Sequence, residues 1–87
     1  MREVTIKGIL DVVNGFDNLD ISEEQVEANL SDLGMDSMTF IQIIVGLEEI
    51  FDCEIPDSKL LITEMDTVQK MFDVLQELYN SNFPQGI

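Results

Sequence analysis

Asp36 and Ser37 are the residues of this sequence whose types and spacing could do chemistry. They stand in the stretch LGMDSM, Leu33 to Met38, just before the longest apolar run of the chain. A serine in this position could help a helix to start, act as a nucleophile, or be the hydroxyl to which another group is attached. The rest of the sequence discriminates among these three roles.

A catalytic serine needs a neighbouring base that removes the hydroxyl proton. The chain has no histidine, and its only lysines, Lys7, Lys59 and Lys70, do not form a Ser-x-x-Lys pair with Ser37. Carboxylates have an ordinary pKa of about 4, which makes them weak bases for a hydroxyl. These absences weigh against catalysis by Ser37, and we expect no catalytic residue.

The helix-starting role belongs more naturally to Asp36. The sequence predicts a helix from Ser37 to Phe51 with Asp36 as its N-cap, and Gly34 lets the chain turn sharply before it. Ser37 then remains available for attachment. A phosphodiester there would meet free backbone N–H groups and the positive end of the helix dipole, while Asp36 opposes it by like-charge repulsion.

The predicted helix has two apolar faces, since successive residues turn by about 100° around its axis. Met38, Ile41 and Val45 fall on a face beside Ser37, apart from the core stripe. Apolar side chains rimmed by acids are typical of a docking surface; in the alternative, the preceding loop covers Met38 and Ile41. The core stripe comprises Phe40, Ile43, Ile44, Leu47, Ile50 and Phe51, and the expected partner-binding residues are Met38, Ile41, Gln42, Val45, Glu48, Glu49 and Asp52.

Turn and cap signals predict an all-α fold: a small four-helix bundle, three helices long and one short, with a long loop between the first and second helices. Asn14-Gly15 ends the first helix, and Ser22 with Gln25 forms a capping box inside the loop. Asp66, with Gln69 at capping-box spacing, is expected to cap the last helix. The short helix starts at Asp57-Ser58 and runs through residues 59–62. One domain spans 1–87, ordered over about 3–80, with a frayed tail at 81–87.

The charge of the chain is strongly one-sided. Its 87 residues include 18 acidic and 4 basic side chains, for a net charge of −14, and no basic residue lies between positions 8 and 58. This excess disfavours nucleic acid and anionic membranes and favours partners with basic patches.

Other classes of site find little support. One cysteine and no histidine argue against zinc, and Leu19 and Ile21 occupy ligand positions of a calcium loop counted from Asp17, so we expect no metal site. Cys53 is expected to be a small residue in a turn. No apolar run is long enough to span a membrane and no signal peptide precedes the first helix, so we expect a soluble, cytoplasmic monomer.

The segment LGMDSMTFIQIIVGLEEIFDCEIPD resembles the prosthetic-group segment of acyl carrier proteins and of the related peptidyl and D-alanyl carriers. The resemblance covers about residues 4–80, and Asp66-Thr67-Val68 fits the start of the family's last helix. The matching residues of the motif are Gly34, Asp36, Ser37, Met38, Leu47, Glu48, Glu49, Phe51, Ile55 and Pro56.

The resemblance implies that a phosphopantetheinyl transferase joins 4′-phosphopantetheine from coenzyme A to Ser37, with Asp36 recognised by that transferase. The thiol of the arm would carry acyl or aminoacyl groups as thioesters for fatty-acid, polyketide or nonribosomal peptide synthesis. Activating, condensing and modifying enzymes with basic docking patches would be the partners, and the resemblance implies that the protein itself is not an enzyme.

Two positions depart from the pattern of fatty-acid carriers. Gln42 and Thr39 stand where those proteins commonly have acids, which thins the acidic face near Ser37. The alternative from another class is a small acidic interaction or regulatory domain without a prosthetic group, in which Ser37 only starts a helix.

Overall fold

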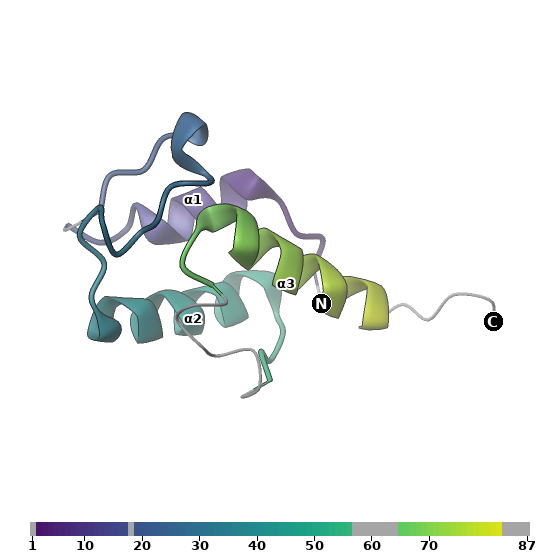
Figure 1. Ribbon diagram of the computed structural model, residues 1–87. Coiled ribbons are helices and arrows are strands. Elements are labelled where there is room, and N and C mark those ends of the chain that lie inside the picture. Colours follow the sequence, from purple (N-terminus) through teal and green to yellow (C-terminus); the bar gives the residue numbers. More distant parts are fainter. Residues whose placement is uncertain (1, 18, 57–64, 83–87) are drawn as a thin grey trace.

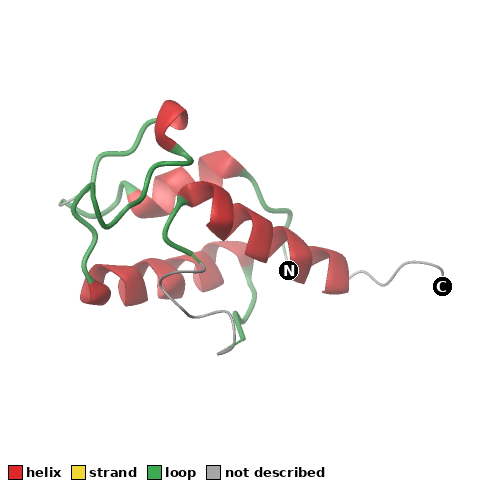
Figure 2. Cartoon of the chain, in the orientation of Figure 1, coloured by secondary structure: helices red, strands yellow, loops and turns green. Residues whose placement is uncertain are grey.

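The computed structural model describes residues 2–17, 19–56 and 65–82 (Figure 1). Within these ranges the chain forms helices and loops without any strand, so the predicted all-α class is confirmed (Figure 2). The elements are α1 (Ile6–Val13), the 3₁₀ helix η1 (Glu23–Gln25), α2 (Ser37–Phe51) and α3 (Val68–Asn82).

The predicted count of four helices is supported only in part. Three α-helices are present in the described ranges, and the expected short helix at 59–62 lies outside them. The first helix has 8 residues, so it is shorter than expected, whereas α2 and α3 have 15 each. Helix α3 continues to Asn82, slightly past the boundary expected for the ordered core.

Polar side chains define both ends of α1. The Gly8 N–H donates to Thr5 Oγ1 at 3.0 Å, which makes Thr5 the N-cap. The helix ends at Asn14, as the Asn-Gly signal predicts. The Asn14 side chain then bridges to Ile21: its Nδ2 donates to the Ile21 carbonyl at 2.8 Å, and its Oδ1 accepts the Ile21 N–H at 2.7 Å. These two bonds close the first part of the long loop.

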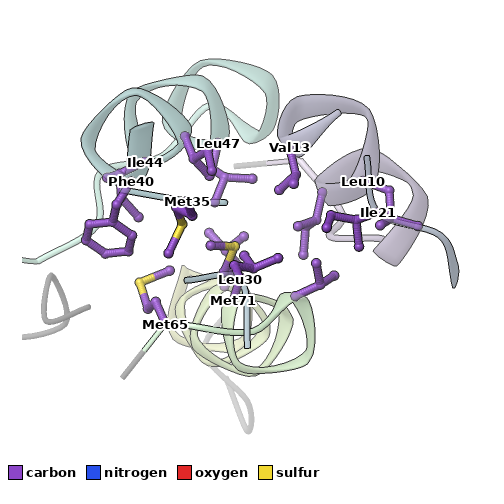
Figure 3. Close-up of a cluster of buried hydrophobic side chains, with 14 of the residues drawn as sticks. Leu10, Val13, Ile21, Leu30, Met35, Phe40, Ile44, Leu47, Met65 and Met71 are labelled. Carbon is purple, nitrogen blue, oxygen red and sulfur yellow. The ribbon is translucent and has the colours of Figure 1, made fainter. Parts of the chain in front are cut away.

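Side chains from the three helices and the loops meet in one core (Figure 3). Leu47 of α2, Val13 of α1 and Met71 of α3 are fully buried there. The loops contribute as well, because Leu30, from the connection between α1 and α2, is also fully buried. The residues labelled in Figure 3 are Leu10, Val13, Ile21, Leu30, Met35, Phe40, Ile44, Leu47, Met65 and Met71.

Two glycines let α1 and α2 pack closely. A β-carbon on Gly46 would lie 2.8 Å from Val12 Cγ1, and one on Gly8 would lie 2.9 Å from Phe51 Cζ. Side chains larger than hydrogen would therefore push the helices apart. This close approach sets which face of α2 is covered by α1.

The long loop before α2 is fixed by backbone bonds to the start of α3. The Leu30 N–H donates to the Asp66 carbonyl at 2.7 Å, and the Gln69 N–H donates to the Val26 carbonyl at 2.8 Å. Within the loop, Gln25 Oε1 accepts the Ser22 N–H at 3.0 Å, as its capping-box spacing predicts. The two backbone bonds attach the loop to the start of α3.

The predicted cap of α3 at Asp66 is wrong. The helix begins at Val68, and the Lys70 N–H donates to Thr67 Oγ1 at 3.0 Å, so Thr67 occupies the cap position. Asp66 instead forms an ion pair with Lys70, 3.0 Å between Oδ1 and Nζ. Gln69 completes no capping box, since its amide donates to Asp73 Oδ1 at 3.1 Å.

The contrast between the two faces of α2 gives a stability prediction. Leu47→Ala should lower the free energy of unfolding by about 2–5 kcal/mol, because it leaves a cavity in the core. Ile41→Ala should change it by about 0.5 kcal/mol or less, since that side chain is exposed on the same helix. Urea unfolding of both variants followed by circular dichroism measures the difference, and equal losses would contradict this division of α2.

Candidate functional site at the start of helix α2

Ser37 is the first residue of α2 and its side chain is exposed. The chain reaches it through Gly34, whose φ of 119° is a left-handed conformation that glycine adopts without strain. Met35 is buried, with 4% of its surface exposed, and fixes the chain just before the helix. A buried anchor on one side and a regular helix on the other hold the Ser37 backbone in place.

Asp36 caps α2, as the sequence predicts. Its Oδ1 accepts the Thr39 N–H at 2.8 Å, and its carbonyl accepts the Phe40 N–H at 2.9 Å. The bond from the Thr39 backbone lowers the pKa of the Asp36 carboxyl below its ordinary value, with a further contribution from the Thr39 side chain. A carboxylate with a lowered pKa is a still weaker base, so Asp36 is poorly suited to remove a proton from Ser37.

The position of Ser37 fits a phosphate-linked group. Its hydroxyl lies at the N-terminus of a 15-residue helix, where backbone N–H groups and the helix dipole favour an anion. The side chain is open to an approaching enzyme, and Asp36 already performs the capping role. The residues present therefore fit a phosphodiester on Ser37.

Next to Ser37, three large apolar side chains of α2 are exposed. Met38 is 72% exposed, Ile41 62% and Val45 47%, and we call these three the docking strip. The alternative in which the loop covers Met38 and Ile41 is thereby wrong. Side chains of this kind exposed in a row are typical of a surface that receives another molecule.

Two hollows adjoin the docking strip, and Ile41 and Val45 line both of them. One hollow has a volume of about 340 Å³ and the other about 370 Å³. The first is lined by Phe40, Ile41, Ile44, Val45 and Glu48, and the second by Phe16, Ile41, Gln42, Val45, Gly46 and Glu49.

The sequence did not reveal the part that Phe16 takes in this surface. Phe16 lies in the long loop, more than 20 positions before the strip, and only the tertiary structure brings it beside Ile41. Its signal in the sequence is a large apolar residue directly after the Asn14-Gly15 turn. Phe40 and Ile44 were expected to serve the core alone, yet they also line the first hollow.

The expected acidic rim divides into two kinds of side chain. Glu49 and Asp52 are exposed, as is Gln42 between the apolar residues. Glu48 is half-buried, and its Oε2 accepts the Ile55 N–H at 2.8 Å. Glu48 therefore has a structural contact, which was not expected for a residue assigned to docking alone.

Cys53 follows α2 in the turn where the sequence places it and is half-buried. Burial raises the pKa of its thiol, and the negative charge of Glu48 adds to this effect. The thiol is therefore mostly protonated at neutral pH and a poor nucleophile. The expected effect of neighbouring acids on the pKa of Cys53 is present, although burial raises this pKa more.

Neither a metal centre nor a membrane span is found in the described part of the chain. Its acidic and cysteine side chains form no cluster of three that could hold a metal ion. None of its helices has the length and apolar character needed to cross a bilayer.

Comparison with known proteins assigns the chain to a family. Residues 6–75 match the family model described as the phosphopantetheine attachment site. A D-alanyl carrier protein of Lactobacillus helveticus is 36% identical over 77 residues, which cover 87% of this chain and 96% of that protein. An acyl carrier protein of Buchnera aphidicola subsp. Acyrthosiphon pisum is 40% identical over 65 residues, covering 71% of this chain and 79% of that protein.

These matches define the class of the protein: a small carrier with covalently attached 4′-phosphopantetheine. The chain belongs to the acyl carrier protein family. Membership in this family also implies encounters with transferases and biosynthetic enzymes.

The cap at Asp36 leads to a prediction about pH. The folded pKa of Asp36 lies below the ordinary value of 3.8, so its stabilising effect is present above pH 3.8 and is lost as the pH falls through the folded pKa. Asp36→Ala should therefore unfold at lower urea concentration than the wild type at pH 7, and the two midpoints should converge below pH 3.8.

Asp36→Asn is the control for this prediction, because asparagine retains an acceptor for the Thr39 N–H. Its midpoint at pH 7 should stay closer to that of the wild type. An Asp36→Ala midpoint equal to the wild-type value at pH 7 would show that the cap contributes nothing.

Proposed function

We propose that Ser37 bears the 4′-phosphopantetheine arm and that the chain is a non-catalytic carrier of acyl or aminoacyl groups. The supporting observation is the exposed Ser37 hydroxyl at the first position of α2, with the capping role already filled by Asp36. When bound, the arm supplies a thiol that holds the carried group as a thioester. The chain itself presents that group to the enzymes that act on it.

Attachment is a phosphoryl transfer carried out by a separate enzyme. The Ser37 oxygen bonds to the phosphorus next to pantetheine in coenzyme A, and the bond to the other phosphate breaks. Adenosine 3′,5′-bisphosphate leaves, and the serine proton passes to a base of the transferase. Asp36 directly precedes Ser37 and is exposed, with one carboxylate oxygen accepting the Thr39 N–H, so we assign it to recognition by the transferase or its metal ion.

Attachment of the arm to Ser37 should increase the intact mass of the protein. Incubation with coenzyme A and a broad-specificity phosphopantetheinyl transferase should add one phosphopantetheine to the wild type and none to Ser37→Ala. Intact-mass spectrometry reads both results, and Ser31→Ala, in the loop before α2, is a matched control that should still be loaded. An unmodified, correctly folded wild type would favour the rival of a small acidic interaction domain. An adduct that persists in Ser37→Ala would remove the site assignment.

We propose that partners dock on the strip Met38, Ile41 and Val45, with Gln42, Glu48, Glu49 and Asp52 around it. The exposed apolar side chains supply contact area, and the acids attract basic patches on partner enzymes. Charges at the edge of an interface act mainly on the rate of encounter. Such an interface suits a carrier that must visit and leave several enzymes.

Glu49 is the acid that tests this docking surface most cleanly, because it is exposed and lines the second hollow. Glu49→Lys should lower kcat/KM for loading by about 3–10-fold at low salt, with less effect at high salt. Its unfolding midpoint should remain close to that of the wild type.

Glu24→Lys is the matched control, since it makes the same change of charge in η1, which lies apart from α2 in Figure 1. It should load at nearly the wild-type rate. Equal losses in both variants would indicate a general effect of net charge and would remove Glu49 from the docking surface.

For the carried group, we propose an aminoacyl cargo as the first class to test. The relative that covers 87% of this chain is named a D-alanyl carrier protein, whereas the relative named acyl carrier protein covers 71%. Loading of the phosphopantetheine form by D-alanine-activating and fatty-acyl-activating enzymes, compared by intact mass, distinguishes these classes. Because the arm comes from coenzyme A, we expect the protein to work in the cytoplasm.

A further inference from the structure

Glu48 holds the turn that follows α2 through its backbone and its side chain. Its carbonyl accepts the N–H groups of Asp52 and of Cys53, the latter at 3.0 Å. Its carboxylate Oε2 accepts the Ile55 N–H at 2.8 Å. One residue thus receives three N–H donors of the segment 52–55, which we call the α2 turn.

The α2 turn needs such support because its backbone is unusual. Asp52 has a φ of 54°, a left-handed conformation that costs free energy for residues other than glycine. Ile55, with 4% of its surface exposed, is the buried end of the turn. The Glu48 carboxylate reaches across the turn and satisfies the backbone N–H at this buried end.

The same Glu48 side chain faces the proposed docking surface. It lines the first hollow together with Ile41 and Val45 of the docking strip. A carboxylate has about four lone-pair positions, so the Ile55 N–H leaves room for a second donor. Arg2 lies near the end of α2, since its backbone N–H donates to the Phe51 carbonyl at 2.7 Å, but within the described part of the chain no lysine or arginine forms an ion pair with Glu48. A basic side chain of a partner is therefore a suitable second donor.

We propose that Glu48 is a positioning residue that couples the docking strip to the α2 turn. A lysine or arginine of the partner enzyme pairs with the Glu48 carboxylate while that carboxylate holds the Ile55 N–H. Docking then stabilises the turn, and a formed turn strengthens docking by the same factor, because coupling between two equilibria is reciprocal. This inference rests on the docking surface proposed above. It adds the contact through which a partner docked on α2 stabilises the α2 turn.

The first experiment tests the turn without any partner. In a Ser37→Ala background, Cys53 is the only thiol, so its alkylation rate reports opening of the α2 turn. Glu48→Ala removes the bond to Ile55 and should raise hydrogen exchange of the Ile55 amide and alkylation of Cys53 by about 5–10-fold. Circular dichroism should show that the helices remain formed.

Glu48→Gln separates the hydrogen bond from the charge. Glutamine keeps an acceptor for the Ile55 N–H but loses the charge that helps to raise the pKa of Cys53. Exchange of the Ile55 amide in Glu48→Gln should stay within about twofold of the wild type, because the bond is retained. Glu49→Gln, the exposed neighbour, should behave like the wild type in both measurements. Unchanged Ile55 exchange in Glu48→Ala would overturn the role of Glu48 in the turn.

The second experiment tests the coupling by adding a saturating amount of phosphopantetheinyl transferase to the same Ser37→Ala chains. Binding should slow Ile55 exchange by at least about threefold in the parent chain and in a Glu24→Gln control made in the same background, but not in Glu48→Gln, which lacks the charge. Equal slowing in Glu48→Gln would mean that the transferase simply covers the turn, and it would overturn the coupling.

Failure of this inference is distinguishable from failure of the proposed function. If the wild type is loaded on Ser37 while a bound transferase leaves Ile55 exchange unchanged, the attachment site stands and the coupling is wrong. If no transferase binds or loads the chain, the proposed function and the coupling fail together, and the first experiment still decides the role of Glu48 in the turn.

Discussion

Burial of one face of α2 is the constraint on which the rest of this structure depends. Ile43 and Leu47 are fully buried, and the close approach of Gly46 to Val12 fixes the helix against α1. A helix packed in this way cannot rotate about its axis, because any rotation would expose apolar side chains and open cavities. Its opposite face must therefore remain outside, and that face carries Ser37 and the docking strip.

Near each end of α2 a carboxylate accepts a backbone N–H, and the helix dipole has the opposite sign at the two ends. Asp36 lies at the N-terminus, where the dipole favours negative charge and the Thr39 N–H donates to its carboxylate. Glu48 lies in the last turns, where the dipole disfavours an anion, and the Ile55 N–H offsets this cost. One end has the exposed Ser37 next to the Asp36 cap, and the other connects the helix to the turn beyond it.

The distribution of charge suits a protein that moves between enzymes. Acids exposed around an apolar strip accelerate encounters with basic surfaces without requiring a tight complex. The absence of basic residues between positions 8 and 58 leaves those acids without competing cations from the same part of the sequence. Family membership and surface chemistry are thus consistent with each other, because a carrier protein meets transferases and biosynthetic enzymes.

The sequence by itself determined the features that depend on local order along the chain. The cap at Asp36, the buried and exposed stripes of α2 and the lack of a base for Ser37 all follow from residue type and helical period. Tertiary structure alone decided that Thr67 caps α3, that Glu48 reaches Ile55, and that Phe16 lies beside Ile41. The physical reason is that these contacts depend on where separate segments meet and on one-residue differences at helix ends, which a periodic pattern does not specify.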